Sequence, residues 1–287
     1  MAKAEKPLKV SIATSAVLVL FKFCAGWVTQ SMAIFASALD SLLDVGNSLV
    51  NLLASKEAAK PPDKEHEYGH GKIESLAALF QSEIILASGF YLVSESVKRL
   101  FTGQKIHGAG WGILVMLLSL TITFFLVRYL RGECRKEESK ILEVEELHFS
   151  MDLWSGLGVV AALLIVQFTG HGYWDLVISL AVAAWIFKSA FGIMRSAVNE
   201  LLDRSIGPVT HEEITALIQS YHPKITGLHD FRSRRVAGRI FLDFHIEIKD
   251  ETDFIKAHDI AESLVSQLKE RYKEADVTIH YDPPGAP

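Results

Sequence analysis

The sequence contains six long apolar stretches, each of them long enough to cross a lipid bilayer. A membrane-spanning helix needs about 20 mostly apolar residues, and 49% of this chain is hydrophobic, which supplies several such segments. Backbone polar groups inside a bilayer must be satisfied within the segment itself, which favours helices. The sequence therefore predicts an all-α membrane domain of six transmembrane helices at residues 8–29, 32–54, 74–100, 109–131, 144–169 and 174–200.

The residues after position 206 follow a different pattern, with more charges and shorter apolar segments. Thr210 is placed to cap a helix that begins at His211. Arg239–Ile248 reads RIFLDFHIEI, and this strict alternation is typical of a half-buried strand. An amphipathic helix at 254–272 and a short strand at 277–279 follow. The order α-β-β-α-β predicts a small α+β, ferredoxin-like domain.

Lysine and arginine are unevenly distributed among the predicted loops. Cytoplasmic loops of membrane proteins carry an excess of these residues. Here they concentrate at the amino end, after the second span and after the fourth, at Lys3, Lys6, Lys9, Lys56, Lys60, Lys64, Lys72, Arg128, Arg131, Arg135, Lys136 and Lys140. The opposite side carries only Lys98, Arg99 and Lys105. We therefore predict that both termini lie in the cytoplasm, together with a domain at 207–287 that follows the transmembrane domain at 1–206.

Two of the predicted spans carry ionisable residues at depth. Asp40 and Asp44 lie in the second span, and His148 and Asp152 lie in the fifth. A spacing of four residues places each pair on one helix face. Charged groups inside a bilayer are costly and mark functional sites, and three carboxylates with one imidazole suit a tetrahedral zinc ion. The alternative is that each pair only forms hydrogen bonds with neighbouring helices, which explains so many costly carboxylates less well.

Two further groups of potential ligands lie outside the spans. Asp63, His66 and His70 follow the second span, where spacing alone is equally compatible with a metal site near the membrane surface and with a solvated polar loop. The small domain contains a second group, His229, His245, His258, His280 and Asp282. Each of these residues, taken singly, is compatible with an ordinary packed or surface position.

Composition argues against several other classes of protein. Cys24 and Cys134 are far apart and form no C-x-x-C pair, so neither a disulfide framework nor a thiolate zinc site is predicted. A site without thiolates also argues against copper(I). The net charge is −5, and acidic residues outnumber lysine and arginine after residue 207. We therefore expect no nucleic-acid partner.

Several segments together resemble one known family, the cation diffusion facilitators, and especially their bacterial zinc and ferrous-iron efflux branch. The resemblance extends from Leu20 to Pro283. Any one motif would be weak, but the set is specific: SALDSLLDVGNS (37–48), DKEHEYGHGKIE (63–74), LHFSMD (147–152), ELLDRS (200–205), GLHDFRSRR (227–235) and IHYDP (279–283).

The resemblance implies a homodimer in the cell inner membrane that exports divalent metal ions by alternating access, with protons moving in the opposite direction. It implies a transport site at Asp40, Asp44, His148 and Asp152, and a loop site at Asp63, His66 and His70. A cytoplasmic metal cluster is implied at His229, His245, His258, His280 and Asp282. Finally, the resemblance implies a charge pair between Lys72 and Asp203 that ties helices together near the cytoplasmic surface.

The chemistry of these ligands is consistent with that exchange. Carboxylates and imidazole must lose their protons to bind a metal, so metal and protons compete for one site. Histidine favours zinc and cadmium over manganese, although the ligand set alone does not separate zinc from ferrous iron, cobalt or nickel. We therefore predict that the transported ion, and the ion bound at the cytoplasmic sites, is Zn²⁺, with Cd²⁺ as a secondary cargo.

A second charge pair is predicted from helix geometry. Glu83 and Lys188 lie deep in the third and sixth spans, where an isolated ion would be costly. Measured along the helices from Lys72 and Asp203, the two side chains come to similar depths, about 16 and 22 Å at 1.5 Å per residue. Their helical angles from those two residues are also small, about 20° and about 60°. We therefore predict a buried ion pair between Glu83 and Lys188, with exposure to a water-filled cavity as the alternative.

Three alternative functions differ from zinc export. The first keeps the fold but has iron or manganese as cargo. The second, an intramembrane zinc hydrolase, requires an open metal position and a general base. The sequence contains no H-E-x-x-H motif, and one tetrahedral ion would use all four intramembrane ligands. The third is a metal sensor with a membrane anchor, for which six spans with buried carboxylates are far more than an anchor needs.

Overall fold

The chain divides into two compact units, Met1–Val198 and Asn199–Pro287. The structure is a computed structural model that describes residues 4–29, 32–102, 110–137, 139–169, 173–249, 253–272 and 275–285. The domain boundary predicted between residues 206 and 207 lies in the connection between the last helix of the first unit, which ends at Leu201, and the next helix, which begins at Pro208.

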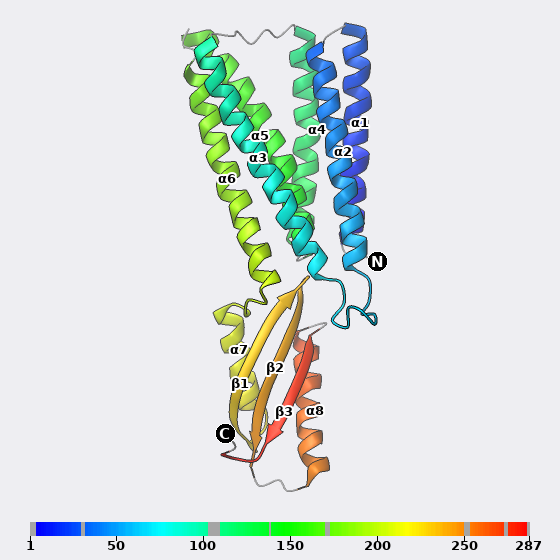
Figure 1. Cartoon of the computed structure of the whole chain (residues 1–287), viewed down its shortest axis with the longest axis vertical. Coiled ribbons are helices and arrows are strands. Elements are labelled where there is room, and N and C mark those ends of the chain that lie inside the picture. The colour runs from blue at the N-terminus through cyan, green and yellow to red at the C-terminus, as the bar shows by residue number, and fades with distance from the viewer. Residues whose placement is uncertain are drawn as a thin grey trace. The chain divides into compact units, whose positions relative to one another are not determined.

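The N-terminal unit consists of long helices whose bounds lie within a few residues of the six predicted spans (Figure 1). They are α1 (Glu5–Thr29), α2 (Met32–Ala58), α3 (Lys72–Thr102), α4 (Gly110–Cys134), α5 (Lys140–Thr169) and α6 (Tyr173–Leu201). The apolar stretches predicted the helices well because each segment is too long and too uniformly apolar for a strand.

Four of these helices are long and apolar enough to cross a membrane, over Glu5–Val28, Lys72–Glu95, Leu114–Cys134 and Leu176–Leu201. Within the described ranges, α2 and α5 do not meet that standard. These are the two helices that carry the predicted intramembrane ligands. Composition therefore indicates a multi-pass membrane protein, but by itself it supports four crossings rather than the predicted six.

Helix packing brings α2 and α5 together. The helix α1 packs against α2, α4 packs against α5, and α2 also contacts α5. A buried apolar cluster joins α3, α5 and α6 through Ala78, Ile85, Val144, Leu147, Ile186, Ala190 and Ala197. The ligand-bearing helices thus have neighbours on several sides, which allows their polar faces to point at each other rather than at lipid.

The predicted buried pair between Glu83 and Lys188 is wrong, because both side chains are exposed. Ile85 of α3 and Ile186 of α6 lie in one buried cluster. Glu83 and Lys188 are each two residues away from those contacts, which is about 200° around a helix. Both charges therefore point away from the face on which α3 and α6 pack.

The C-terminal unit contains a three-stranded sheet and two helices in the predicted order. The elements are α7 (Pro208–Tyr221), β1 (Ile225–Val236), β2 (Arg239–Ile248), α8 (Phe254–Arg271) and β3 (Asp276–Asp282). The strand order is β1-β2-β3, with β1 antiparallel and β3 parallel to β2. The element order matches the α-β-β-α-β pattern on which the ferredoxin-like prediction rests.

The helix α7 begins earlier than predicted. It starts at Pro208, and Gly207 occupies the cap position without a side-chain hydrogen bond. Proline suits the first helical position because its φ is already helical and no N–H is needed there. The predicted cap at Thr210 is therefore wrong.

The two helices pack on one face of the sheet (Figure 1). Alternate residues of β2 are buried against them, among them Leu242, Phe244 and Ile246. Since successive side chains of a strand point to opposite faces, His245 lies on the face of the sheet that the helices leave open. The alternation in the sequence predicted a half-buried strand here, and β2 is one.

Candidate metal centres

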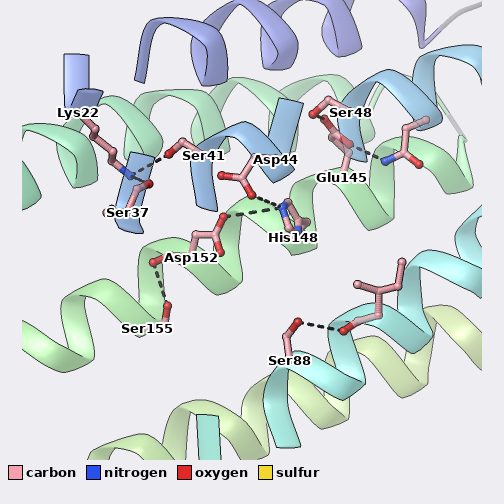
Figure 2. A network of polar contacts seen from close by, with 12 residues as sticks. Lys22, Ser37, Ser41, Asp44, Ser48, Ser88, Glu145, His148, Asp152 and Ser155 are labelled. Atoms are coloured by element: carbon pink, nitrogen blue, oxygen red, sulfur yellow. Dashed lines mark hydrogen bonds and ion pairs between the residues drawn. The ribbon is translucent and has the colours of Figure 1, made fainter. Parts of the chain in front are cut away.

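The contact between α2 and α5 contains the first cluster of potential ligands (Figure 2). His148 Nε2 lies 3.0 Å from Asp44 Oδ1 and 3.9 Å from Asp152 Oδ2. The His148 side chain is only 8% exposed, and its buried Nδ1 atom has no hydrogen-bond partner in the part of the chain that the structure describes. Each of the three residues offers a ligand atom, and these atoms lie within 4.8 Å of one another. One small cation fits among such donors.

Asp40 lies outside this cluster, although the sequence predicted it as the fourth ligand. It is one helical turn from Asp44 on α2, and it is exposed. The three clustered residues alone leave a tetrahedral ion one position short. The structure therefore brings together three of the four predicted transport-site residues, and Asp40 is the nearest carboxylate along α2.

Sequence reasoning missed two charged residues beside this cluster. Lys22 of α1 donates a hydrogen bond of 2.8 Å to Ser41 Oγ on α2. Glu145 of α5 is 1% exposed and accepts hydrogen bonds from Ser48 Oγ at 2.5 Å and Asn51 Nδ2 at 2.6 Å. Both are charged residues within apolar helices, and this feature of the sequence could have identified them.

A second cluster, formed by Asp63, His66 and His70, lies between α2 and α3. Asp63 Oδ1 is 3.6 Å from His66 Nδ1, and Asp63 Oδ2 is 3.4 Å from His70 Nε2. The two imidazole rings have centroids 4.6 Å apart. The chain can turn back on itself here because Gly69 adopts a φ of +83°, which glycine accepts without strain.

The backbone of this turn prepares Asp63 as an anionic ligand. The backbone N–H groups of His66 and Glu65 both donate to Asp63 Oδ1, at 2.7 and 2.9 Å. These two bonds stabilise the carboxylate and lower the pKa of Asp63 below its usual range. His70 is 8% exposed and its Nδ1 has no hydrogen-bond partner among the described residues. The geometry fits a metal ligand set better than a solvated loop.

The third cluster is a row of three histidines across the sheet. His229 of β1 is the register partner of His245 on β2, which is in turn the partner of His280 on β3. Asp282 lies among them, 2.9 Å from His245 Nδ1, 3.0 Å from His280 Nε2 and 3.5 Å from His229 Nε2. One carboxylate therefore faces three imidazoles on one face of the sheet.

The histidines around Asp282 favour its charged form. The hydrogen bond from His245 lowers the pKa of the Asp282 carboxyl below its usual range, and the positive charge available on all three histidines adds to the effect. With the described residues, His229 Nε2 makes no hydrogen bond, although it lies 3.5 Å from the Asp282 carboxylate. Imidazole nitrogens and a carboxylate oxygen at these distances suit zinc.

Two residues of this region differ from prediction. His258 is exposed on α8, where its ring stacks near Phe254, and it belongs to none of the clusters formed by the described residues. Asp230, which was not predicted, groups with His229 and His245. Its φ of +50° and the irregular register between His229 and Arg232 place it at a bulge in β1, and a bulge cannot be read from alternation.

The predicted charge pair joins residues of two different units. Lys72 begins α3 of the N-terminal unit, whereas Asp203 belongs to the C-terminal unit. Within its own unit, Asp203 Oδ2 lies 3.4 Å from Arg234 Nη1. The pair between Lys72 and Asp203 therefore stays a prediction.

Family models account for nearly the whole chain. Residues 8–202 match the cation efflux transmembrane domain, and residues 206–284 match the cytoplasmic domain of cation efflux proteins. The chain belongs to the cation efflux, or cation diffusion facilitator, family. Members of this family are transporters rather than enzymes, so the zinc hydrolase and the anchored sensor are excluded as readings of the chain.

Curated relatives cover the chain almost end to end. It is 35% identical over 269 residues to the cation-efflux pump FieF of Citrobacter koseri, an alignment that spans 94% of this chain and 89% of the relative. It is 34% identical over 278 residues to FieF of Salmonella choleraesuis, with 96% and 92% covered. The chain is therefore similar in both length and sequence to cation-efflux pumps.

Two solved structures also match part of the chain. One is a zinc form of the putative zinc transporter CzrB, with 29% identity and a TM-score of 0.28 over 30% of this chain and 97% of that one. The other is the metal-bound C-terminal domain of the CzcD transporter from Thermotoga maritima, with 25% identity and a TM-score of 0.26 over 28% and 98%.

Proposed function

We propose that this transporter exports Zn²⁺, and also Cd²⁺, from the cytoplasm in exchange for protons. The observation that carries the proposal is the convergence of Asp44, His148 and Asp152 at the contact between α2 and α5. Two carboxylates and an imidazole within one small volume bind a divalent ion when deprotonated and release it when protonated. Asp40, one turn away, would complete the set when the ion is bound.

Exchange follows from this competition if the site opens to one side of the membrane at a time. Metal enters from the cytoplasm, where the ligands are deprotonated. Protons from the more acidic side then displace it after the helices have rearranged. Because the same atoms bind either the metal or the protons, the two flows are coupled without any covalent step.

A second cargo is compatible with the same site. Two of the three clustered ligands are carboxylates, and oxygen donors suit harder ions such as Mn²⁺ and Fe²⁺. The imidazole of His148 favours zinc over manganese. We therefore place zinc first and iron or manganese second.

The membrane arrangement belongs to the same proposal. All six long helices cross the bilayer, because α2 and α5 can bury their polar faces against one another rather than in lipid. The distribution of lysine and arginine supports a cytoplasmic position for both termini. The protein is a homodimer of the cell inner membrane, with a transport domain at 1–206 and a metal-binding domain at 207–287 in each protomer.

Reconstitution into liposomes tests the function directly. With an imposed proton gradient, the wild-type protein should move zinc against the direction of proton flow, and collapsing the gradient should stop the uptake. Competition by cadmium, ferrous iron, manganese, cobalt and nickel at equal concentration ranks the cargoes. Preference for manganese or iron over zinc would contradict the proposed cargo, and uptake that ignores the gradient would contradict proton exchange.

The C-terminal unit should associate more tightly when it binds metal. It has a hydrophobic core of its own, so residues 199–287 should fold alone. Starting at residue 199 keeps the hydrogen bond from Ala237 N to Glu200 Oε1 and the contact between Asp203 and Arg234. Ligands shared across a dimer contact would couple zinc binding to association. Sedimentation with zinc and with chelator should show more dimer with zinc.

Two matched variants sharpen that measurement. His245→Ala removes the middle of the histidine row and should abolish the effect of zinc on association. His258→Ala removes an exposed histidine outside the row and should leave most of it. An unchanged monomer–dimer balance in the wild-type domain would refute the linkage between metal and dimer.

A further inference from the structure

A lysine lies beside the transport-site cluster, although cations and this lysine should repel each other. Lys22 extends from α1 toward α2, where its Nζ donates to Ser41 Oγ at 2.8 Å and approaches the backbone oxygen of Ser37 at 3.4 Å (Figure 2). Ser41 follows Asp40 directly in the sequence and is only 2% exposed. The ammonium group is therefore held on the same stretch of α2 that carries the carboxylates.

The charge of Lys22 acts on the carboxylates of the site. Its hydrogen bond to Ser41 keeps the ammonium group on the turn of α2 that carries both Asp40 and Asp44, where its charge acts on their carboxylates. Within the described ranges, no carboxylate lies within the 4.0 Å of an ion pair to Lys22. The ammonium is thus close enough to influence a bound ion but does not occupy the ligand positions between Asp44 and His148.

A lysine in an apolar helix needs a reason to be there, because burying an ammonium group costs free energy. Without a metal, the carboxylates of Asp44, Asp152 and the nearby Asp40 would carry a concentrated negative charge. A positive charge tethered nearby offsets that charge when the ion has left. The same charge repels a divalent ion when the site is loaded, and both effects make metal release easier.

We propose that Lys22 is a built-in counter-charge that weakens metal binding at the Asp44–His148–Asp152 site and so speeds release. This inference rests on the proposed function. Lys22 binds no metal in this account: it acts through the charge of the carboxylates, which makes it an affinity-setting residue rather than a ligand. Its flexible four-carbon chain lets the ammonium group stay hydrogen-bonded to Ser41 while the ligands change occupancy.

A purely structural role is the competing explanation, since Lys22 also ties α1 to α2. Removal of the charge and removal of the tie can be separated. Lys22→Met removes both, and Lys22→Gln removes the charge while keeping a polar group. Ser41→Ala removes the main hydrogen bond but keeps the charge. Lys188→Met makes the same chemical change at an exposed position of α6, outside all three clusters.

The test measures zinc transport by the full-length protein in liposomes and zinc binding in detergent, counting only the binding that Asp44→Ala removes. Lys22→Met and Lys22→Gln should lower both KM and the dissociation constant about tenfold, a modest value for one full charge acting on a divalent ion. Both variants should also lower kcat, because release becomes slower. Lys22→Arg should stay near wild type, and Lys188→Met should match it.

Particular results would overturn the proposal. A dissociation constant unchanged or raised in Lys22→Gln would show that the charge does not weaken binding. Equal effects of Ser41→Ala and Lys22→Gln would show that the tie between helices matters and the charge does not. If the wild-type protein transports no metal at all, the proposed function fails, while the binding measurement in detergent still decides the role of Lys22.

Discussion

Replacing Asp44 with alanine should abolish metal transport while leaving the protein folded. The Asp44 carboxylate is the group closest to His148, at 3.0 Å, and its side chain is only 18% exposed. Its removal takes one carboxylate from a cluster of three ligands. Changes to residues that merely support metal ligands typically cost 10–100-fold in affinity or activity, so loss of a ligand should cost at least about a hundredfold.

Zinc uptake into liposomes measures this effect, and size-exclusion profiles check the fold. Glu57→Ala is the matched control, because Glu57 lies on the same helix α2 and pairs only with Lys60 in the salt bridges of the described residues. Asp40→Ala is the informative comparison. A loss as large as that of Asp44→Ala would show that Asp40 joins the loaded site. Near-normal uptake by Asp44→Ala would remove Asp44 from the transport site.

The sequence predicted the transport-site cluster because its signal is local. Carboxylates in an apolar helix are rare, and a spacing of four residues places them on one face. What the spacing cannot give is the rotation of α2 against α5. That rotation points Asp44 at His148 and leaves Asp40 exposed one turn away. Which of two equally spaced ligands meets its partner is decided by packing of the whole bundle.

The histidine row also depends on a feature that residue spacing does not predict, here the register of the strands. Alternation predicted that β2 is half-buried, and the burial of β2 confirms it. The pairing of His229 with His245 and of His245 with His280 depends on strand register, which is set by turns and by the bulge near Asp230. His258, like the other histidines of the predicted cluster, was assigned to it by family resemblance, and its place on α8 leaves it exposed.

The predicted pair of Glu83 and Lys188 failed because the apolar faces of α3 and α6, rather than charges at their ends, locate the contact between the two helices. Helical angles were measured from Lys72 and Asp203, which lie in different compact units. The buried cluster that contains Ile85 and Ile186 is the proper reference for the α3–α6 contact. Measured from those residues, both charges point outward, as the structure has them. A helix contact is located by its apolar face, and charges are then placed relative to it.

A contact next to the transport site should matter most for stability. The helices α2 and α5 run in opposite directions, so four residues forward on α2 and three back on α5 lead from the Asp44–His148 contact to the next contact, between Ser48 and Glu145 (Figure 2). Asn51 donates to the second oxygen of the same carboxylate. All three side chains are at most 1% exposed. This contact fixes how α2 sits against α5.

Glu145→Ala should therefore destabilise the solubilised protein more than other single replacements of acidic residues on α5. Hydrogen bonds to a charged group contribute about 1.5–3 kcal/mol, and buried donors left without partners add a penalty, so the loss should be about 3 kcal/mol or more. Glu145→Gln keeps one carbonyl acceptor and should be intermediate.

Glu143→Ala is the control, because Glu143 is 39% exposed and pairs with Lys140 on the same helix. Such a contact is worth at most about 1 kcal/mol. Thermal unfolding in detergent ranks the three variants. If Glu145→Ala unfolds at the same temperature as Glu143→Ala, the Glu145 contact does not hold α2 against α5, and the alignment of Asp44 with His148 must come from the surrounding apolar packing instead.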